Sequence, residues 1–147
     1  ISIIMKYKNK DNYLLVKLER GDEIMYSLKN LAEKENINFA QVNGIGLVEE
    51  VEIGLFDFKT RKYKHRKLSG EYELTSLMGN ITIKENNPFV HMHVNISDDN
   101  YKCFGGHLFH AKITVTGELF VIVLNDKVER KYDEFIGLHL WDLDSCE

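Results

Sequence analysis

The segment Pro88–Ser97, "PFVHMHVNIS", alternates apolar and polar side chains over most of its length, which is typical of a β-strand. Side chains two residues apart on a strand point to the same face. His91, His93 and Asn95 are therefore predicted to share one face. The opposite face carries the apolar row Val90, Met92, Val94 and Ile96. The two imidazoles thus lie on the face opposite this apolar row.

Most other segments around this strand also have the composition of strands, rich in β-branched and aromatic residues and separated by Gly, Asn or charged clusters. These candidates are Tyr13–Glu19, Phe39–Gly46, Val48–Phe58, Tyr72–Ile83 and Ala111–Leu124. Gly21–Asn36 instead has apolar residues at helical spacing and predicts one amphipathic helix of about four turns. Because strands do not alternate with helices, the sequence predicts an α+β fold, an antiparallel sheet with one main helix packed on it.

The length and composition predict one compact domain in a reducing compartment. With 147 residues, the chain is expected to form a single domain over residues 11–142, with an N-terminal extension over 1–10 and a C-terminal tail over 143–147. No signal peptide or membrane span is found, so no membrane partner is expected. Cys103 and Cys146 form no CxxC pair and are predicted to be free thiols, which favours a cytoplasmic location.

A second histidine motif follows in Phe104–Lys112, "FGGHLFHAK", where two glycines precede His107. Glycine allows close approaches of the backbone. If this segment folds back beside the first strand, His107 joins His91 and His93, and three imidazoles with an open fourth position match catalytic zinc. Imidazole suits zinc, copper, iron and nickel, whereas magnesium and calcium prefer oxygen ligands. The sequence therefore predicts a transition-metal site, with zinc as the first expectation and iron, nickel or manganese as alternatives.

The histidines also admit a simpler interpretation. A His-x-His pair on a strand is by itself more often two partly exposed or hydrogen-bonded side chains than a metal site. His110 follows Phe109 in an apolar context and is expected to be a packed or surface side chain. His65 and His139 lie in no motif. No catalytic residue can be named from the pattern alone.

The stretch Gly79–Leu124, which contains both histidine motifs, resembles the PPC domain, a plant and prokaryote domain also found beside AT-hooks in plant nuclear proteins. The resemblance runs from about Tyr13 to about Trp141. It implies an α+β domain that assembles into a homotrimer. It also implies that His91, His93 and His107 can hold a metal, as in prokaryotic members. Glu118 matches a family position that often carries Glu, and its role is left open.

More distantly, His-x-His followed by Gly-Gly-His is similar to acetolactate decarboxylase, whose three histidines hold zinc. That likeness implies an alternative function, a small metal-dependent lyase acting on a hydroxy-keto carboxylate, in which a cation such as Arg holds the carboxylate. The arginines weighed for this role are Arg20, Arg61, Arg66 and Arg130. All are flanked by charged or loop residues and none lies in a recognisable site motif, which disfavours the decarboxylase.

The segment "KTRKYKHRK" is the one obvious basic cluster of the sequence. Its cations are Lys59, Arg61, Lys62, Lys64, Arg66 and Lys67. Such a patch can neutralise phosphates, and binding would then be steeply salt dependent. The alternative is a solvated hairpin tip, which the net charge of −4 favours. The Arg-Gly-Arg-Pro hook of the plant proteins is missing from this chain. The sequence therefore predicts at most weak DNA binding with little base preference.

Overall fold

Period-two alternation of apolar side chains produces eight β-strands in the computed structural model, which describes residues 5–144. The strands are β1 (Lys6–Lys10), β2 (Tyr13–Leu18), β3 (Ala40–Asp57), β4 (Lys62–Lys84), β5 (Asn87–Ser97), β6 (Cys103–Val123), β7 (Glu129–Asp133) and β8 (Leu138–Asp142). The pairings between them are antiparallel, except that β7 meets β4 in parallel. One helix, α1 (Ile24–Lys34), completes this part of the chain. The predicted α+β class is confirmed.

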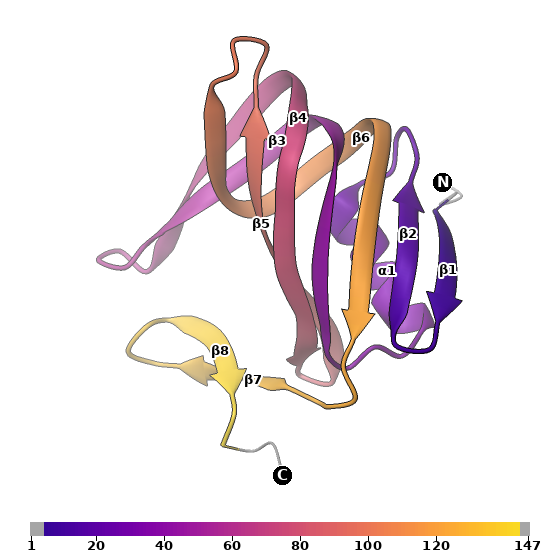
Figure 1. Cartoon of the computed structure of the whole chain (residues 1–147). Coiled ribbons are helices and arrows are strands. Elements are labelled where there is room, and N and C mark those ends of the chain that lie inside the picture. The colour runs from indigo at the N-terminus through magenta and orange to yellow at the C-terminus, as the bar shows by residue number, and fades with distance from the viewer. Residues whose placement is uncertain (1–4, 145–147) are drawn as a thin grey trace.

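The sheet curls so that four of its strands form a closed ring of pairings. Along the main path the order is β1-β2-β6-β3-β4-β7-β8, and β5 pairs with both β4 and β6. The first part of β6 lies beside β5, and its later part lies between β3 and β2. Figure 1 shows β6 bending across the molecule to make this change of partner. Residues near the bend are therefore brought against several strands at once.

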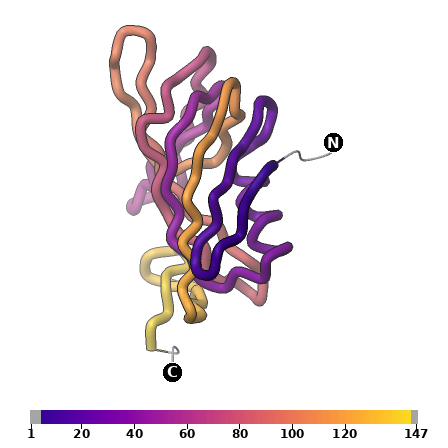
Figure 2. The backbone as a smooth tube through the Cα atoms, turned by 45° about the vertical axis from the view of Figure 1, so that its right-hand side comes forward, coloured from indigo at the N-terminus to yellow at the C-terminus, as the bar shows by residue number. Residues whose placement is uncertain are grey.

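The helix covers one face of the sheet, as Figure 2 shows. Its buried apolar side chains are Ile24, Leu28, Leu31 and Ala32, which join the core cluster. It has 11 residues, about three turns rather than the predicted four. The shortening occurs because Asn36 adopts a left-handed conformation with φ of 53°, and the Ile37 amide then donates to the Ala32 carbonyl. In the described part of the chain, no helix is long and apolar enough to cross a membrane.

Glu23 fixes the start of α1 against the sheet. Its carboxylate accepts hydrogen bonds from the backbone N–H groups of Met25 and Tyr26, at 3.1 and 2.6 Å. The same carboxylate accepts from the Ala111 N–H of β6 at 3.1 Å. Capping satisfies amides that have no partner inside the helix. One side chain therefore both begins the helix and joins it to β6.

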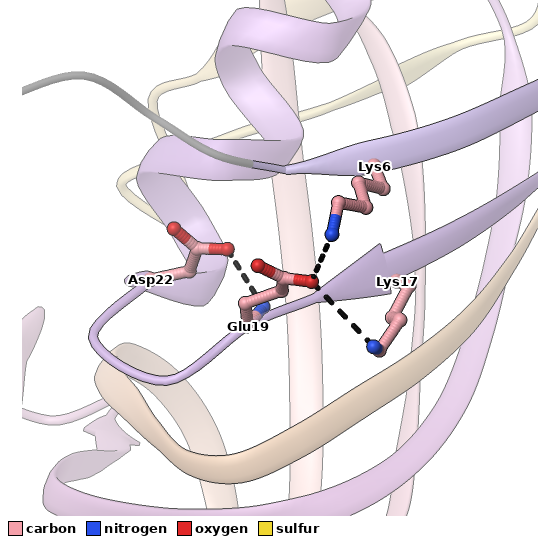
Figure 3. Close-up of polar contacts among 4 residues, drawn as sticks. All are labelled: Lys6, Lys17, Glu19 and Asp22. Atoms are coloured by element: carbon pink, nitrogen blue, oxygen red, sulfur yellow. Dashed lines mark hydrogen bonds and ion pairs between the residues drawn. The ribbon is translucent and has the colours of Figure 1, made fainter.

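The turn between β2 and α1 is held by charged contacts at Glu19. The Glu19 carboxylate accepts a hydrogen bond from Lys6 of β1 at 2.8 Å and lies 3.5 Å from the ammonium of Lys17. Figure 3 shows both contacts. The Glu19 amide in turn donates to the Asp22 carboxylate at 2.8 Å. The hydrogen bond from Lys6 is the main reason that the pKa of Glu19 is lowered. These contacts join β1 to the turn that leads into the helix.

The hairpin formed by β7 and β8 is not predicted from the sequence, in which no strand is expected beyond Leu124. It is joined to β4 where the Ile83 amide donates to the Val128 carbonyl at 2.9 Å. Its turn packs on the end of the β3–β4 hairpin, with 5.6 Å between the ring centroids of Phe58 and Phe135. The C-terminal hairpin is thereby positioned near one end of the closed ring.

Parts of the predicted N-terminal extension and C-terminal tail, residues 1–4 and 145–147, lie outside the described residues, as does Cys146. Cys103 is free and exposed at the start of β6.

Candidate metal centre

Strand register brings the three motif histidines together. His91 and His93 lie two residues apart on β5 and therefore share a face. His107 of β6 is the direct cross-strand partner of His93. At the same position His107 is also the partner of Gly54 on β3. It thus lies where β6 passes from one neighbour to the other, at the bend of the sheet.

The three side chains converge closely enough to share one ion. One ligand nitrogen from each of His91, His93 and His107 can be chosen so that all three lie within 4.8 Å of one another. The Nε2 atoms of His91 and His93 are 3.3 Å apart. Two nitrogens bound to a tetrahedral zinc ion at about 2.0–2.1 Å would be separated by about 3.3–3.4 Å. This pair therefore already has the spacing that the ion requires.

The two glycines before His107 allow β6 to fit between its neighbours. A Cβ atom on Gly106 would lie 2.8 Å from the Gly54 carbonyl oxygen of β3, and one on Gly105 would lie 3.0 Å from the Val94 carbonyl oxygen of β5. Both distances are shorter than ordinary contacts, so larger residues would push the strands apart. The glycines thus serve close backbone approach, and this approach sets the position of His107.

Burial keeps two of the imidazoles neutral. The pKa of His91 is lowered to about 4, mainly by burial and further by the charge of Arg130. The pKa of His107 is also lowered to about 4, again mainly by burial. The ring of His107 packs beside Tyr63 and Phe109, with ring centroids 4.8 and 4.7 Å away. Both histidines are therefore neutral at pH 7, the form in which imidazole binds a metal.

Arg130 of β7 belongs to this site, although it lies in no recognisable site motif of the sequence. Its Nη2 atom lies 3.4 Å from Nδ1 of His91 and donates to the Asn80 amide oxygen at 3.0 Å. Its Nε and Nη1 atoms donate to the Thr82 hydroxyl at 2.8 Å and to the His139 carbonyl at 3.1 Å. No local motif could have indicated this role, because it depends on the pairing of β7 with a strand more than 40 residues away in sequence.

Two cavities border the cluster. One, of about 280 Å³, lies between the histidines and the β7–β8 hairpin and is lined by His91, His107 and Arg130 together with aromatic and aliphatic side chains. The other, of about 380 Å³, is lined by His91 and His93 on the side of Met78. A small molecule therefore has space beside the imidazoles, and His91 lies at the boundary of both cavities.

The remaining candidates lie outside the three-histidine cluster. Glu118 is eleven residues beyond His107 on β6, where its cross-strand partners are Lys17 and Ile45. His110 is partly exposed, with Nδ1 3.8 Å from the Glu23 carboxylate. His65 is hydrogen-bonded to Glu52 and stacks on Phe109, which in turn contacts His107. His139 lines the smaller cavity. His65 and His139 thus contribute to the surroundings of the site although neither lies in a sequence motif.

The basic cluster is divided between a turn and a strand. Lys59 and Arg61 lie in the turn before β4, and Lys62, Lys64, Arg66 and Lys67 lie on β4. Alternation places Lys62, Lys64 and Arg66 on one face of the strand and Lys67 on the other. Lys64 forms an ion pair with Asp57 at 2.7 Å, and Arg66 stacks on Phe104. All six are exposed, but they do not form one continuous face.

The family model of the Plants and Prokaryotes Conserved (PCC) domain matches residues 5–125. The chain belongs to this family. The match contains all three histidines and ends before the β7–β8 hairpin that carries Arg130. The PPC resemblance of the sequence is thereby confirmed.

Solved structures with the same fold come from bacteria and archaea. A candidate DNA-binding protein from Bacteroides thetaiotaomicron is 26% identical, with a TM-score of 0.93 over 96% of this chain and 99% of that one. A PPC protein from Pyrococcus horikoshii is 34% identical, with a TM-score of 0.83 over 97% and 96%. A metal-containing protein from Archaeoglobus fulgidus is 31% identical, with a TM-score of 0.84 over 95% and 98%.

A comparison with curated proteins found no match. The more distant likeness to acetolactate decarboxylase stays a prediction, because none of the three solved structures is described as a decarboxylase.

Proposed function

We propose that the protein binds one transition metal ion per chain through His91, His93 and His107, with zinc as the first expectation. The convergence of three imidazoles, two of them 3.3 Å apart, is the observation that carries the proposal. No carboxylate belongs to the cluster among residues 5–144, which favours a transition ion over magnesium or calcium. Nδ1 of His107 is buried without a hydrogen-bond partner in this range, a cost that a bound ion or ligand can remove. The metal-containing relative supports the same conclusion.

The metal-bearing domain is proposed to act as a homotrimeric regulatory or nucleic-acid-associated module in the cytoplasm. The relative described as a candidate DNA-binding protein supports the association with nucleic acid. The exposed cations of β4 offer phosphate contacts, although one of them is already paired with Asp57. The exposed apolar side chains on the sheet face opposite α1 support assembly.

A metal-dependent enzyme is the second candidate function, favoured by the cavity beside the histidines. A bound metal ion would act there as a Lewis acid towards a substrate oxygen. The chain's own contribution would be to hold the ion, to exclude water with Tyr63 and Phe109, and to orient a charged substrate group at Arg130.

The metal proposal is tested by elemental analysis of protein purified without nickel chromatography. We expect about one zinc or other transition ion per wild-type chain. His93→Ala should reduce the metal content to below about one tenth per chain, because two imidazoles alone do not complete the site. The matched variant His65→Ala should keep the wild-type content. Wild-type protein that contains no metal, and takes up none on addition of zinc, cobalt or nickel, would contradict the proposal.

Association with DNA is tested by fluorescence anisotropy with duplexes of unrelated sequence over a range of salt concentrations. We expect weak binding that falls roughly one log unit per log unit of salt for each phosphate contact. The double variant Lys62→Ala with Arg66→Ala should bind more weakly and show a shallower salt dependence. Lys8→Ala with Lys10→Ala, which also changes two exposed strand cations, should not. Tight binding at high salt or a clear base preference would contradict this expectation.

A further inference from the structure

Arg130 is a half-buried cation that has no carboxylate partner within residues 5–144. Its hydrogen bonds go to a hydroxyl, a carbonyl and an amide oxygen, all uncharged. Burial lowers its pKa, and the one group that opposes this effect is the Tyr63 phenol, which is itself neutral at pH 7 because burial raises its pKa from the ordinary value. Guanidinium groups withdrawn from water are ordinarily paired with an anion. The positive charge of Arg130 is therefore not compensated by a carboxylate in the described part of the chain.

When His91 binds a metal, its contact with Arg130 can no longer be a hydrogen bond. The Nε2 atom of His91 faces His93, so metal binding through Nε2 leaves the proton on Nδ1. That N–H then points towards Nη2 of Arg130, 3.4 Å away, which is also a donor. A metal-bound histidine normally donates its second N–H to an acceptor. In the metal-loaded protein, the Nδ1–H group of His91 and the Nη2–H group of Arg130 therefore face each other. A third group must accept hydrogen bonds from both.

We infer that the cavity between the histidine cluster and the β7–β8 hairpin binds a small organic carboxylate, with Arg130 as its anchor. The inference rests on the proposed metal site, because the ion adds positive charge and fixes the proton on Nδ1 of His91. A carboxylate accepts from both donors at once, and two oxygens in a plane match the guanidinium fork. It also balances the charge of the ion and Arg130, which three neutral imidazoles cannot do.

The other walls of the cavity fit the apolar body of such a ligand. Phe109, Leu138 and Leu140 line it, and its volume of about 280 Å³ is sufficient for a molecule of roughly ten heavy atoms. Lys84 adds a second cation at the wall, lying over the ring of Phe89. No Asp or Glu of the described range lines the cavity. The combination of cationic and apolar walls selects an organic anion over inorganic phosphate.

The anchor and the metal ligands lie in different parts of the chain. The three histidines fall inside the family match, which ends at residue 125, whereas Arg130 and the two leucines lie beyond it. Anion binding is therefore separable from metal binding by substitution in the C-terminal hairpin alone.

The experiment compares benzoate with benzamide, which has nearly the same shape but no charge, by calorimetric titration of zinc-loaded protein. We expect benzoate to bind at least tenfold more tightly than benzamide. Arg130→Met should weaken benzoate binding at least tenfold and leave the zinc content unchanged. Arg66→Met is the matched control, since Arg66 stacks on Phe104 as Arg130 stacks on Phe89, but lies outside the cavity. This variant should bind benzoate like the wild type.

Equal affinities for benzoate and benzamide, or unchanged benzoate binding in Arg130→Met, would overturn the inference. Inorganic phosphate binding as tightly as benzoate would overturn the assignment to organic carboxylates. If Arg130→Met does not fold, Arg130→Lys keeps the charge without the fork and should still weaken binding, while the benzoate and benzamide comparison needs no variant. The zinc content of the wild-type protein is measured separately, by elemental analysis. Absence of zinc in that measurement would count against the metal site.

Discussion

Burial of His91 and His107 contributes to the way the metal-free protein responds to acid. Their pKa values of about 4 in the folded chain lie below the ordinary value of about 6.5 expected in the unfolded chain. As the pH falls through 6.5, the unfolded chain takes up protons at these positions and the folded chain does not. Their contribution to stability is therefore complete above pH 6.5 and is lost as the pH falls towards 4.

We predict that the melting temperature of chelated wild-type protein falls more between pH 7 and pH 4.5 than that of the double variant His91→Gln with His107→Gln. Glutamine does not titrate, so the variant lacks the proton uptake on unfolding. Carboxylates are common to both proteins, and the difference between the two curves isolates the imidazoles. Thermal unfolding by circular dichroism measures it. Parallel curves over this range would show that the two histidines are not held neutral by the fold.

At the residue scale, local patterns indicated part of the site and could not indicate the rest. The shared face of His91 and His93 follows from alternation along one strand, and the glycines before His107 indicate a close backbone approach. The position of Arg130 depends on a parallel pairing between β7 and β4, which no short pattern encodes. The charged neighbours of Arg130, Glu129 and Lys131, are typical of a solvated segment, so the local sequence does not indicate that Arg130 belongs to the site.

At the scale of elements, the site depends on how closely β4 and β5 approach beside His91. Gly79 of β4 faces Met92, and a Cβ atom there would overlap the His91 carbonyl oxygen and come within 2.7 Å of the Met92 sulfur. The carbonyl is backbone and cannot move without shifting the strand. Glycine at this position therefore fixes the separation of the strands and, through it, the place of His91.

We predict that Gly79→Ala lowers the free energy of unfolding by about 3 kcal/mol, because the added methyl group forces two paired strands apart. The same shift moves His91 and should weaken zinc binding in competition with a chelator. Urea unfolding measures the first effect. Ser69→Ala, at an exposed position of the same strand, should change stability by less than about 0.5 kcal/mol. An unchanged midpoint for Gly79→Ala would contradict this account of the strand spacing.

The elements were predicted best where periodicity is local. Alternation indicated most strands, and helical spacing indicated α1, but the sequence divided β3 into two segments because Gly44 and Gly46 suggested a break. In the structure β3 continues through them with a change of register. The β7–β8 hairpin was missed because its strands are only five residues long, and because β7 is mostly charged. The position of this hairpin depends instead on contacts with β4 and with the end of the β3–β4 hairpin, which are far away in sequence.

At the scale of the whole molecule, one row of exposed and half-buried side chains crosses the sheet face opposite α1. Successive cross-strand partners in this row are Leu15, Phe120, Asn43, Met78 and His93. Phe120 and Met78 are 50% and 54% exposed, although both are large and apolar. Exposed apolar side chains gathered on one face indicate an interaction surface. Because the row ends at His93, an interface formed on this face would border the metal centre.

We predict that the protein in solution has three times the 17.1 kDa mass of one chain, and that this face forms the contact between copies. Phe120→Glu should convert the trimer to monomers at micromolar concentration, because it places a charge among the exposed apolar side chains of this face, and burying that charge would be unfavourable. Tyr26→Glu alters an equally exposed aromatic residue on α1, on the other side of the sheet, and should leave the mass unchanged.

Light scattering across a dilution series measures both variants and the wild type. A monomeric wild type would contradict the assembly, and a trimeric Phe120→Glu variant would place the contact on another face. If the trimer forms as predicted, its dissociation should also alter zinc affinity, since Met78 and His93 border the same cavity.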